Sequence, residues 1–261
     1  MAYELLTLEI DARHVATVTL DRPEVHNALD DRLMAELTRA FAELEKDESV
    51  RIAVLAGNGK SFCAGGDLNW MRSTKGYSRE ENIADSNKLS MLYATLRNFS
   101  RPLIGIVHGA ALGGGSGLAA VCDFVVAADD TKFGFPETRI GILPAVISPY
   151  AIEKIGFSAA RAYFISGMPF SAATAKEIGL VHRVVPREKL DAAREEIVGE
   201  FLKAAPWASR KAKTLISNVV GYDATAFAKI TVEAIADARV GEEGQEGTDA
   251  VLSRRKPKWA P

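Results

Sequence analysis

Cysteine and histidine are both scarce in this chain of 261 residues, which contains two cysteines and four histidines. The two cysteines, Cys63 and Cys122, are too few to build the disulfide framework of a small secreted domain. Four scattered histidines give no basis for a metal cluster, so we expect no metal site. The same scarcity favours a reducing, cytoplasmic setting.

A surplus of charge of one sign is also lacking, since the formal net charge is −2. A nearly neutral chain offers no general attraction to nucleic acid or to an anionic membrane, so we expect neither as a partner. The composition, 48% hydrophobic and 25% charged, is that of an ordinary soluble globular protein. Acidic residues near the start (Glu4, Glu9 and Asp11) do not fit a signal peptide.

Residues 102–122 carry no acidic or basic side chain apart from His108, and this stretch is long enough to span a bilayer. However, it holds six glycines, and its first part has the apolar character of a buried strand. We therefore predict a buried strand, a glycine turn and a core helix here.

Hydrophobic periodicity predicts an alternation of strands and helices over the first half of the chain. The predicted strands are Leu5–Ile10 and Val15–Leu20, which form a hairpin, then 52–55, Leu103–Val107 and 124–127. The predicted helices are 31–45, with Asp30 as its N-cap, 80–99, and one from the glycines at 113–117 to about Val121. This alternation predicts an α/β fold with a mostly parallel sheet. Beyond residue 186 the pattern is almost entirely helical, with Pro206 starting one helix and Asp223 capping another through Arg239.

Three stretches stand out as candidates for chemistry: 59–67, 108–117 and 133–137. The first two are glycine-rich turns after buried strands, and the third ends in the carboxylate of Glu137. Glycines let backbone N–H groups approach a ligand, and a helix N-terminus adds unpaired donors, which together suit an oxygen that becomes anionic. One glycine cluster alone would indicate tight packing. Two such turns, each followed by a candidate acid or base, favour a functional site.

The common glycine motifs do not fit these turns. Gly59-Lys60-Ser61 lacks the first glycine of a P-loop, because Val54 stands in its place. Ser116 is not the serine of a nucleophile elbow, because Leu118 stands where a glycine is required. The turns therefore call for another interpretation.

Taken jointly, the motifs resemble those of the crotonase family, the enoyl-CoA hydratase/isomerase superfamily. The resemblance covers nearly the whole chain and rests on Arg22-Pro23 with Asn27-Ala28-Leu29, Ala64-Gly65-Gly66-Asp67, Gly113-Gly114-Gly115, Cys122-Asp123, Phe135-Pro136-Glu137 and Lys256-Pro257-Lys258-Trp259. It implies a fold of stacked β-β-α turns, with a crotonase-like core over residues 1–200 and a helical C-terminal oligomerisation region over 201–261. It also implies a trimer or a dimer of trimers, an acyl-CoA substrate, and no separate cofactor, since coenzyme A is part of the substrate.

The resemblance also implies roles for individual residues. Ala64 and Gly114 correspond to the two backbone donors of the oxyanion hole, and Glu137 corresponds to a catalytic glutamate. The residues expected to line the substrate and CoA site are Ala28, Ala64, Gly65, Gly66, Asp67, Gly114 and Gly117. For Asp67 we favour a helix N-cap over a role in proton transfer.

Gly117 departs from the family pattern, in which hydratases carry a second catalytic glutamate at this position. The missing side chain predicts vacant space beside the reacting carbons, which we expect to accept a branch or a carboxylate of the acyl group. Residues 141–150 likewise resemble hydratases of branched glutaconyl-type CoA esters. We expect such an ester to be a better substrate than crotonyl-CoA.

Three functions remain open. Hydration of a 2-enoyl-CoA, including a 3-methylglutaconyl-type ester, is the preferred one. An enoyl-CoA isomerase needs only one carboxylate to move a proton, so it is the nearest alternative. A non-catalytic binding protein on the same fold is the third, although the presence of Glu137 and the net charge of −2 argue against it.

Overall fold

The computed structural model describes residues 3–219 and 224–261, with the backbone alone for 224–229. Within these residues the main sheet has six strands in the order β1-β2-β3-β4-β6-β9. β1 and β2 form the predicted antiparallel hairpin, and from β2 to β9 all neighbours are parallel. The strands are β1 (Leu6–Ile10), β2 (Val15–Leu20), β3 (Ile52–Gly57), β4 (Leu103–Val107), β6 (Phe124–Ala128) and β9 (Arg183–Val185).

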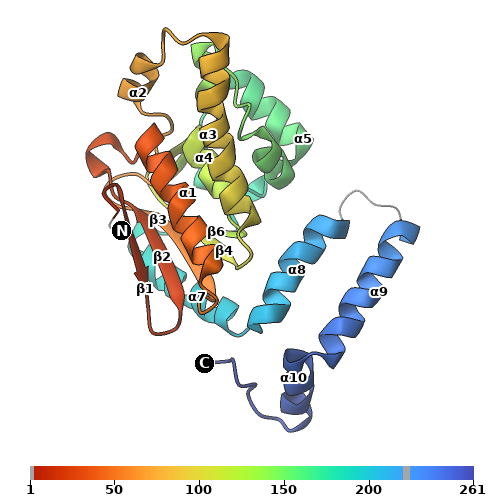
Figure 1. Cartoon of the computed structure of the whole chain (residues 1–261). Helices are drawn as coiled ribbons and strands as arrows, with labels where there is room; N and C mark the ends of the chain where they lie inside the picture. The colour runs from red at the N-terminus through yellow and green to blue at the C-terminus, as the bar shows by residue number, and fades with distance from the viewer. Residues whose placement is uncertain (1–2, 220–223) are drawn as a thin grey trace.

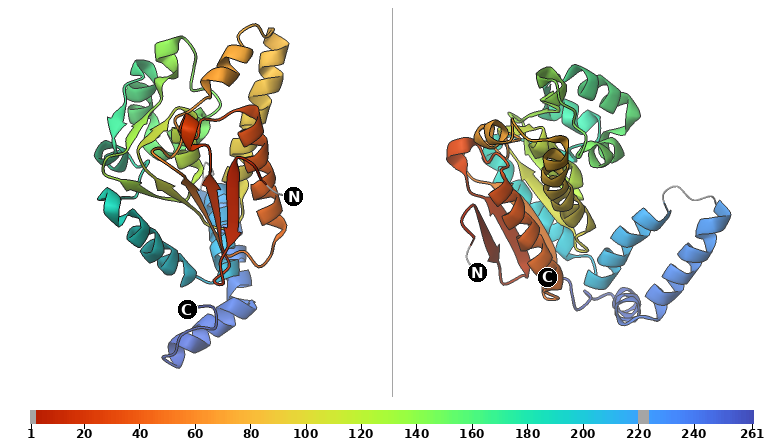
Figure 2. Two further views of the ribbon diagram at one scale, coloured as in Figure 1. Left: turned by 90° about the vertical axis from the view of Figure 1, so that its left-hand side faces the viewer. Right: turned by 45° about the horizontal axis from the view of Figure 1, so that its top comes forward.

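Helices cover both faces of this sheet (Figures 1 and 2). One face packs against α1 (Asp31–Lys46), α3 (Arg79–Asn98), α4 (Gly114–Val121) and α5 (Ser148–Ser166), and the other against α7 (Leu190–Leu202). Because side chains alternate along a strand, neighbours such as Ala53 and Val54 enter different apolar clusters. The parallel strands are therefore buried on both sides, as their continuous apolar runs predicted.

A second, smaller sheet of three strands lies beside the first among the described residues and was not predicted. Its strands are β5 (Ala110–Leu112), β7 (Lys132–Gly134) and β8 (Phe170–Ser171), in the order β5-β7-β8. Only two residues, His108 and Gly109, separate the end of β4 from the start of β5, and Gly109 has a φ of 63°. The chain therefore passes from one sheet to the other at the start of the second glycine-rich stretch.

Short helices connect these elements. They are η1 (Pro23–Val25), α2 (Leu68–Ser73), η2 (Pro136–Ile140), α6 (Ala172–Glu177) and η3 (Arg187–Lys189). Asp30 caps α1 as predicted, because its side chain accepts a hydrogen bond from the N–H of Leu33. Among the residues that the structure describes, no helix is both long and apolar enough to cross a membrane.

The C-terminal helices form an arm that extends away from the core (Figure 1). The arm consists of α8 (Pro206–Val219), α9 (Ala224–Val240) and α10 (Glu242–Leu252), and it begins just after α7 has packed against the sheet. Pro206 starts α8 as predicted, whereas the predicted cap Asp223 lies outside the described residues. Large apolar side chains are exposed along the arm: Ile216, Val232, Ile235, Val240, Val251 and Leu252.

Candidate active site

Two loops leave neighbouring parallel strands and run side by side. β3 and β4 are paired, so their carboxyl ends lie at the same edge of the main sheet. The loop after β3 pairs with β5 through Cys63, whose N–H donates to Ala110 O at 3.0 Å and whose O accepts from Leu112 N at 3.1 Å. Beyond this bridge, a methyl group built on Gly65 would lie 4.0 Å from the backbone nitrogen of Gly114. The two glycine-rich stretches therefore converge, as the sequence predicted.

In the first loop, the structure corrects the predicted donor, Ala64. The N–H of Ala64 donates to the carbonyl oxygen of His26 at 3.0 Å, so this hydrogen is already committed to a structural bond. Leu29, three residues after His26, donates to Gly65 O at 2.7 Å and accepts from Asp67 N at 2.9 Å. Neither bond uses the N–H of the intervening Gly66, which has no hydrogen-bond partner among the described residues. The free donor of this loop is therefore at Gly66, two residues from the predicted position.

In the second loop, the N–H of the predicted donor Gly114 is free among the described residues. Gly114 is the first residue of α4, so its N–H is one of the donors that a helix leaves unpaired. Within the described chain this N–H has no hydrogen-bond partner, whereas Gly113 N donates to Gly134 O at 2.9 Å. Gly113 has a φ of 50°, a left-handed conformation that favours glycine. Gly66 and Gly114 thus place two unpaired N–H groups on adjacent loops.

Glu137 lies beside the second loop because β7 pairs with β5. A methyl group built on Gly113 would lie only 2.9 Å from Glu137 Oε1. The residue is half-buried in η2, and its Oε2 is buried with no hydrogen-bond partner in the described chain. Burial raises the pKa of this carboxyl, although a hydrogen bond from its own backbone N–H opposes the shift. A buried, unpaired carboxylate oxygen with a raised pKa suits a group that exchanges protons with a ligand.

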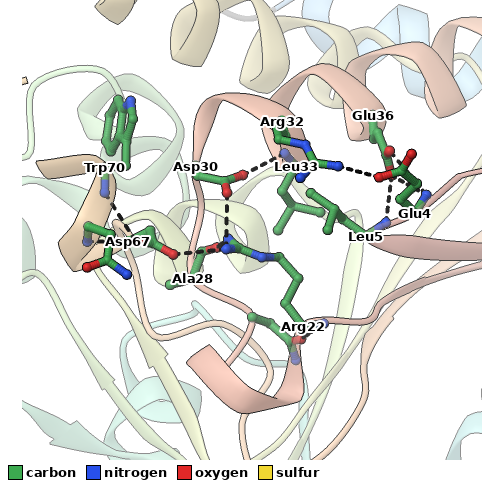
Figure 3. A network of polar contacts seen from close by, with 12 residues as sticks. Glu4, Leu5, Arg22, Ala28, Asp30, Arg32, Leu33, Glu36, Asp67 and Trp70 are labelled. Atoms are coloured by element: carbon green, nitrogen blue, oxygen red, sulfur yellow. Dashed lines mark hydrogen bonds and ion pairs between the residues drawn. The ribbon is translucent and has the colours of Figure 1, made fainter. Parts of the chain in front are cut away.

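Asp67 is occupied by structural bonds, in agreement with the N-cap interpretation (Figure 3). Its Oδ1 accepts from the N–H groups of Asn69 at 2.8 Å and Trp70 at 3.2 Å, and its Oδ2 lies 3.0 Å from the Arg22 guanidinium. Burial by itself raises the pKa of Asp67, but these donors outweigh it and the pKa is lowered. An ionised, fully paired carboxylate is poorly suited to proton transfer.

Arg22 links this carboxylate to the loop that carries Ala28 (Figure 3). It lies 3.0 Å from Asp30 Oδ2 and donates to the Ala28 carbonyl oxygen at 2.6 Å. Ala28 thus lies close to the first loop, where the resemblance expects the CoA site, but its carbonyl group is directed to Arg22. The network fixes the 22–30 segment against α2.

The structure contradicts the predicted vacancy at Gly117. A methyl group built there would lie 2.5 Å from Ile147 Cγ2 and 3.0 Å from both Cε1 and Cζ of Tyr93. Side chains from α3 and from the residue before α5 therefore fill the volume that a glutamate would have used. No space is left for a branch of the acyl group unless these side chains move.

Sequence reasoning did not identify Tyr93 as part of this region. Tyr93 is fully buried, and its hydroxyl donates to the carbonyl oxygen of Gly114 at 2.7 Å. Tyr93 lies four residues after Leu89 in the predicted helix 80–99, so it shares a helix face with an apolar residue, and this spacing was a signal for burial. No local pattern indicates that this ring meets Gly117, because α3 and α4 are brought together only by tertiary packing.

Comparison with known proteins identifies the family. The family model described as enoyl-CoA hydratase/isomerase matches residues 11–261. An enoyl-CoA hydratase structure from Shewanella pealeana is 36% identical, with a TM-score of 0.94, and the match covers 98% of this chain and 96% of that one. The structure of AtuE from Pseudomonas aeruginosa is 35% identical, with a TM-score of 0.95 and coverage of 99% and 100%. A mevalonyl-coenzyme A hydratase, sidH of Aspergillus fumigatus, is 31% identical over 95% of this chain and 92% of its own length.

The chain belongs to the enoyl-CoA hydratase/isomerase family, and the fold is the crotonase fold. It is accordingly an enzyme, a hydratase or an isomerase of that family.

Proposed function

We propose that the enzyme adds water across the double bond of a 2-enoyl-CoA thioester. The observation that carries the proposal is the pair of N–H groups at Gly66 and Gly114 that have no partner among the described residues. The Glu137 carboxylate, with one oxygen unpaired among the same residues, lies beside the second loop. Two converging N–H donors stabilise an oxygen that gains negative charge, and each such donor typically contributes about 3–4 kcal/mol to the transition state. The named hydratases among the relatives support hydration as the reaction.

In this mechanism the Gly66 and Gly114 N–H groups bind the thioester carbonyl oxygen. The Glu137 carboxylate takes a proton from water while the water oxygen bonds to C3, and the electron pair of the double bond moves through C2 to the thioester oxygen. The two N–H groups hold the resulting enolate. Glu137 then returns its proton to C2, which gives the 3-hydroxyacyl-CoA and restores the carboxylate.

The acyl group is proposed to be branched and glutaconyl-like. Gly117 does not support a branched acyl group, because Tyr93 and Ile147 fill the space beside it. Two other observations do: residues 141–150 resemble hydratases of such esters, and one relative is named for a mevalonyl thioester.

Isomerisation is the second candidate, and Gly117 is the observation that favours it. With no side chain at this position, Glu137 is the single carboxylate that matches the family pattern. One carboxylate is sufficient to remove a proton from one carbon of a 3-enoyl-CoA and to return it to another.

A substrate screen with product masses distinguishes these functions. The panel contains crotonyl-CoA, 3-methylglutaconyl-CoA and a straight-chain 3-enoyl-CoA, and each product is analysed by mass spectrometry in ordinary and in ¹⁸O-labelled water. Hydration predicts a product that is one water heavier and carries the label. A product of unchanged mass from the 3-enoyl-CoA alone would replace hydration by isomerisation.

We also propose that the arm assembles copies of the chain into a trimer or a dimer of trimers. Family members are typically oligomeric, and the arm leaves Val232 and Ile235 of α9 more than half exposed, at 64% and 51%. Light scattering should show an oligomer for the unmodified chain and a smaller species for Ile235→Asp. Ile10→Asp, on the edge strand of the core, is the matched control and should leave the molecular mass of the oligomer unchanged. A monomer in the unmodified protein would contradict the proposal.

A further inference from the structure

The turn that presents the Gly114 N–H is built mostly of glycine, with glycines at 113, 114, 115 and 117. Glycine backbones adopt many conformations, so such a turn does not by itself hold an N–H in one direction. An oxyanion donor must nevertheless be aimed at the position of the oxygen to be effective. Contacts from outside the turn therefore have to fix its geometry.

Hydrogen bonds within the turn and from neighbouring elements supply that restraint. Gly113 N donates to Gly134 O at 2.9 Å, and Gly117 N donates to Gly113 O at 3.0 Å. A third is the bond from the Tyr93 hydroxyl to Gly114 O at 2.7 Å. The Ser116 hydroxyl also anchors the turn, since it donates to Ala111 O at 2.7 Å and accepts from Gly134 N at 3.2 Å. The bond from Tyr93 differs in that it holds the carbonyl group of the residue that carries the free N–H.

Tyr93 is itself held in place. The side chain is fully buried on α3, its ring packs against Gly117, and its ring centroid lies 5.8 Å from that of Tyr150. A methyl group built on Gly114 would lie 3.1 Å from the Tyr93 hydroxyl oxygen, so the phenol group packs directly against the turn. The ring thus occupies the space beside Gly117 while its hydroxyl restrains Gly114.

From this geometry we propose that Tyr93 is a positioning residue for the oxyanion hole. Its hydroxyl aims the Gly114 N–H at the thioester oxygen by fixing the Gly114 carbonyl group, and its ring takes the place of a side chain at residue 117. The inference rests on the proposed function of the Gly114 N–H. It explains why this site works with Glu137 alone: the position of a second carboxylate is filled by the side chain that supports the turn.

Tyr93→Phe tests this role because it removes the hydroxyl and keeps the ring. We expect kcat with the best substrate of the panel to fall about tenfold, since a small misplacement of a catalytic group is costly, with little change in KM. Tyr163→Phe is the matched control: Tyr163 lies on α5 outside residues 141–150, its ring packs against that of Phe170, and its hydroxyl has no hydrogen-bond partner in the described part of the chain. We expect it to retain the unmodified kcat.

Acetoacetyl-CoA supplies a readout that does not depend on turnover. Its enolate carries negative charge on the thioester oxygen and absorbs in the ultraviolet, so the pKa of the bound ligand reports the strength of the oxyanion hole. A weaker hole should raise this pKa by about one unit in Tyr93→Phe, corresponding to the tenfold loss in kcat. Tyr163→Phe should leave it unchanged.

Gly117→Ala tests the same restraint of the turn by a different substitution. The added methyl group would push against the Tyr93 ring and Ile147, so we expect a similar fall in kcat with the hydroxyl still present. In the double variant with Tyr93→Phe the two losses should be less than additive, because both act through one hydrogen bond.

Two results would overturn the inference, and they differ from each other. If the unmodified enzyme binds acetoacetyl-CoA and turns over substrate, but Tyr93→Phe keeps the kcat and the ligand pKa of the unmodified enzyme, the positioning role is wrong and the proposed function stands. If the unmodified enzyme neither binds acetoacetyl-CoA nor acts on any thioester of the panel, the proposed function fails, and the role of Tyr93 fails with it.

Discussion

The two loops that form the candidate oxyanion hole begin alike and reach their free N–H groups in different ways. Both follow paired parallel strands, and both are rich in glycine. In the second loop the free donor is set by the start of α4, since the first N–H groups of any helix are unpaired. In the first loop it is set by bonds to His26 and Leu29, which lie more than 30 residues away in the sequence.

This difference explains why a free N–H could be predicted at Gly114 but was predicted at Ala64 in place of Gly66. A helix start is a local feature that the sequence displays, so Gly114 was found directly. Which N–H remains free between Ala64 and Asp67 depends on how a distant segment pairs with the loop. The pairing commits Ala64 to His26 and leaves Gly66 free.

The largest effect is expected at the carboxylate that the two loops share. Glu137→Gln keeps the shape of the side chain and removes the base, so we expect kcat to fall about 10²–10⁴-fold with little change in KM. Steady-state kinetics on the best thioester of the panel measures this. Turnover close to that of the unmodified enzyme would mean that another group, and not Glu137, acts as the base.

Gly66 offers a matched pair of substitutions in the first loop. A methyl group at Gly66 meets only Met71 and Trp70 at 3.6 Å or more, so Gly66→Ala fits and retains the N–H. Gly66→Pro removes the N–H but leaves the two bonds of Leu29 intact. We expect Gly66→Pro to lower kcat about 10²–10³-fold and Gly66→Ala to change it little. Equal rates for the two variants would exclude Gly66 as a donor.

The pH dependence of kcat/KM should report Glu137. Hydration requires the carboxylate form, so activity falls as the pH drops through the pKa of Glu137, and burial places that pKa above its ordinary value of 4.5. The nearby Tyr93 does not titrate in this range, because burial raises its pKa well above 10.0. A titration of kcat/KM should therefore show one acidic limb above pH 4.5, and a limb at or below that value would contradict the assignment.

The smallest effect is on stability. Because the folded-state pKa of Glu137 is raised, the folded protein binds this proton more tightly than the unfolded chain, and stability is lost as the pH rises through the folded pKa. Glu137→Gln should remove that loss and raise the midpoint of thermal unfolding by roughly 2–4 °C at neutral pH for each kcal/mol gained. At a pH below 4.5 the difference between the two proteins should disappear. A midpoint lower than that of the unmodified enzyme at neutral pH would argue for a structural carboxylate.

Much of the fold could be predicted from the sequence because its signals are local. The hairpin, the buried strands, α1 with its cap at Asp30, and the helical C-terminus all follow from periodicity and capping. The small sheet could not be predicted in this way, since β5 and β7 have three residues each and β8 has two. Strands of that length carry too few residues to display an alternating pattern.

In the candidate site, too, contacts between distant elements could not be predicted from local sequence patterns. Gly117 indicates correctly that a side chain is missing, but the sequence cannot say what fills the space. Tyr93 and Ile147 come from other elements, and only packing brings them to Gly117. A missing side chain in a sequence is therefore not evidence of a pocket until its neighbours are known.

Replacing single backbone amides by esters tests the comparison between the loops most directly, because it removes one N–H and leaves the side chains unchanged. We predict that the esters at Gly66 and Gly114 lower kcat about 10²–10³-fold. They should lower the thermal midpoint only slightly, because each also weakens the preceding carbonyl oxygen as an acceptor, at Gly65 and at Gly113. The ester at Ala64 should instead lower the free energy of unfolding by about 1 kcal/mol, through loss of the bond to His26, with kcat unchanged. An Ala64 ester that lowers kcat as much as the Gly66 ester, or a Gly66 ester with unchanged kcat, would contradict this assignment of the oxyanion hole.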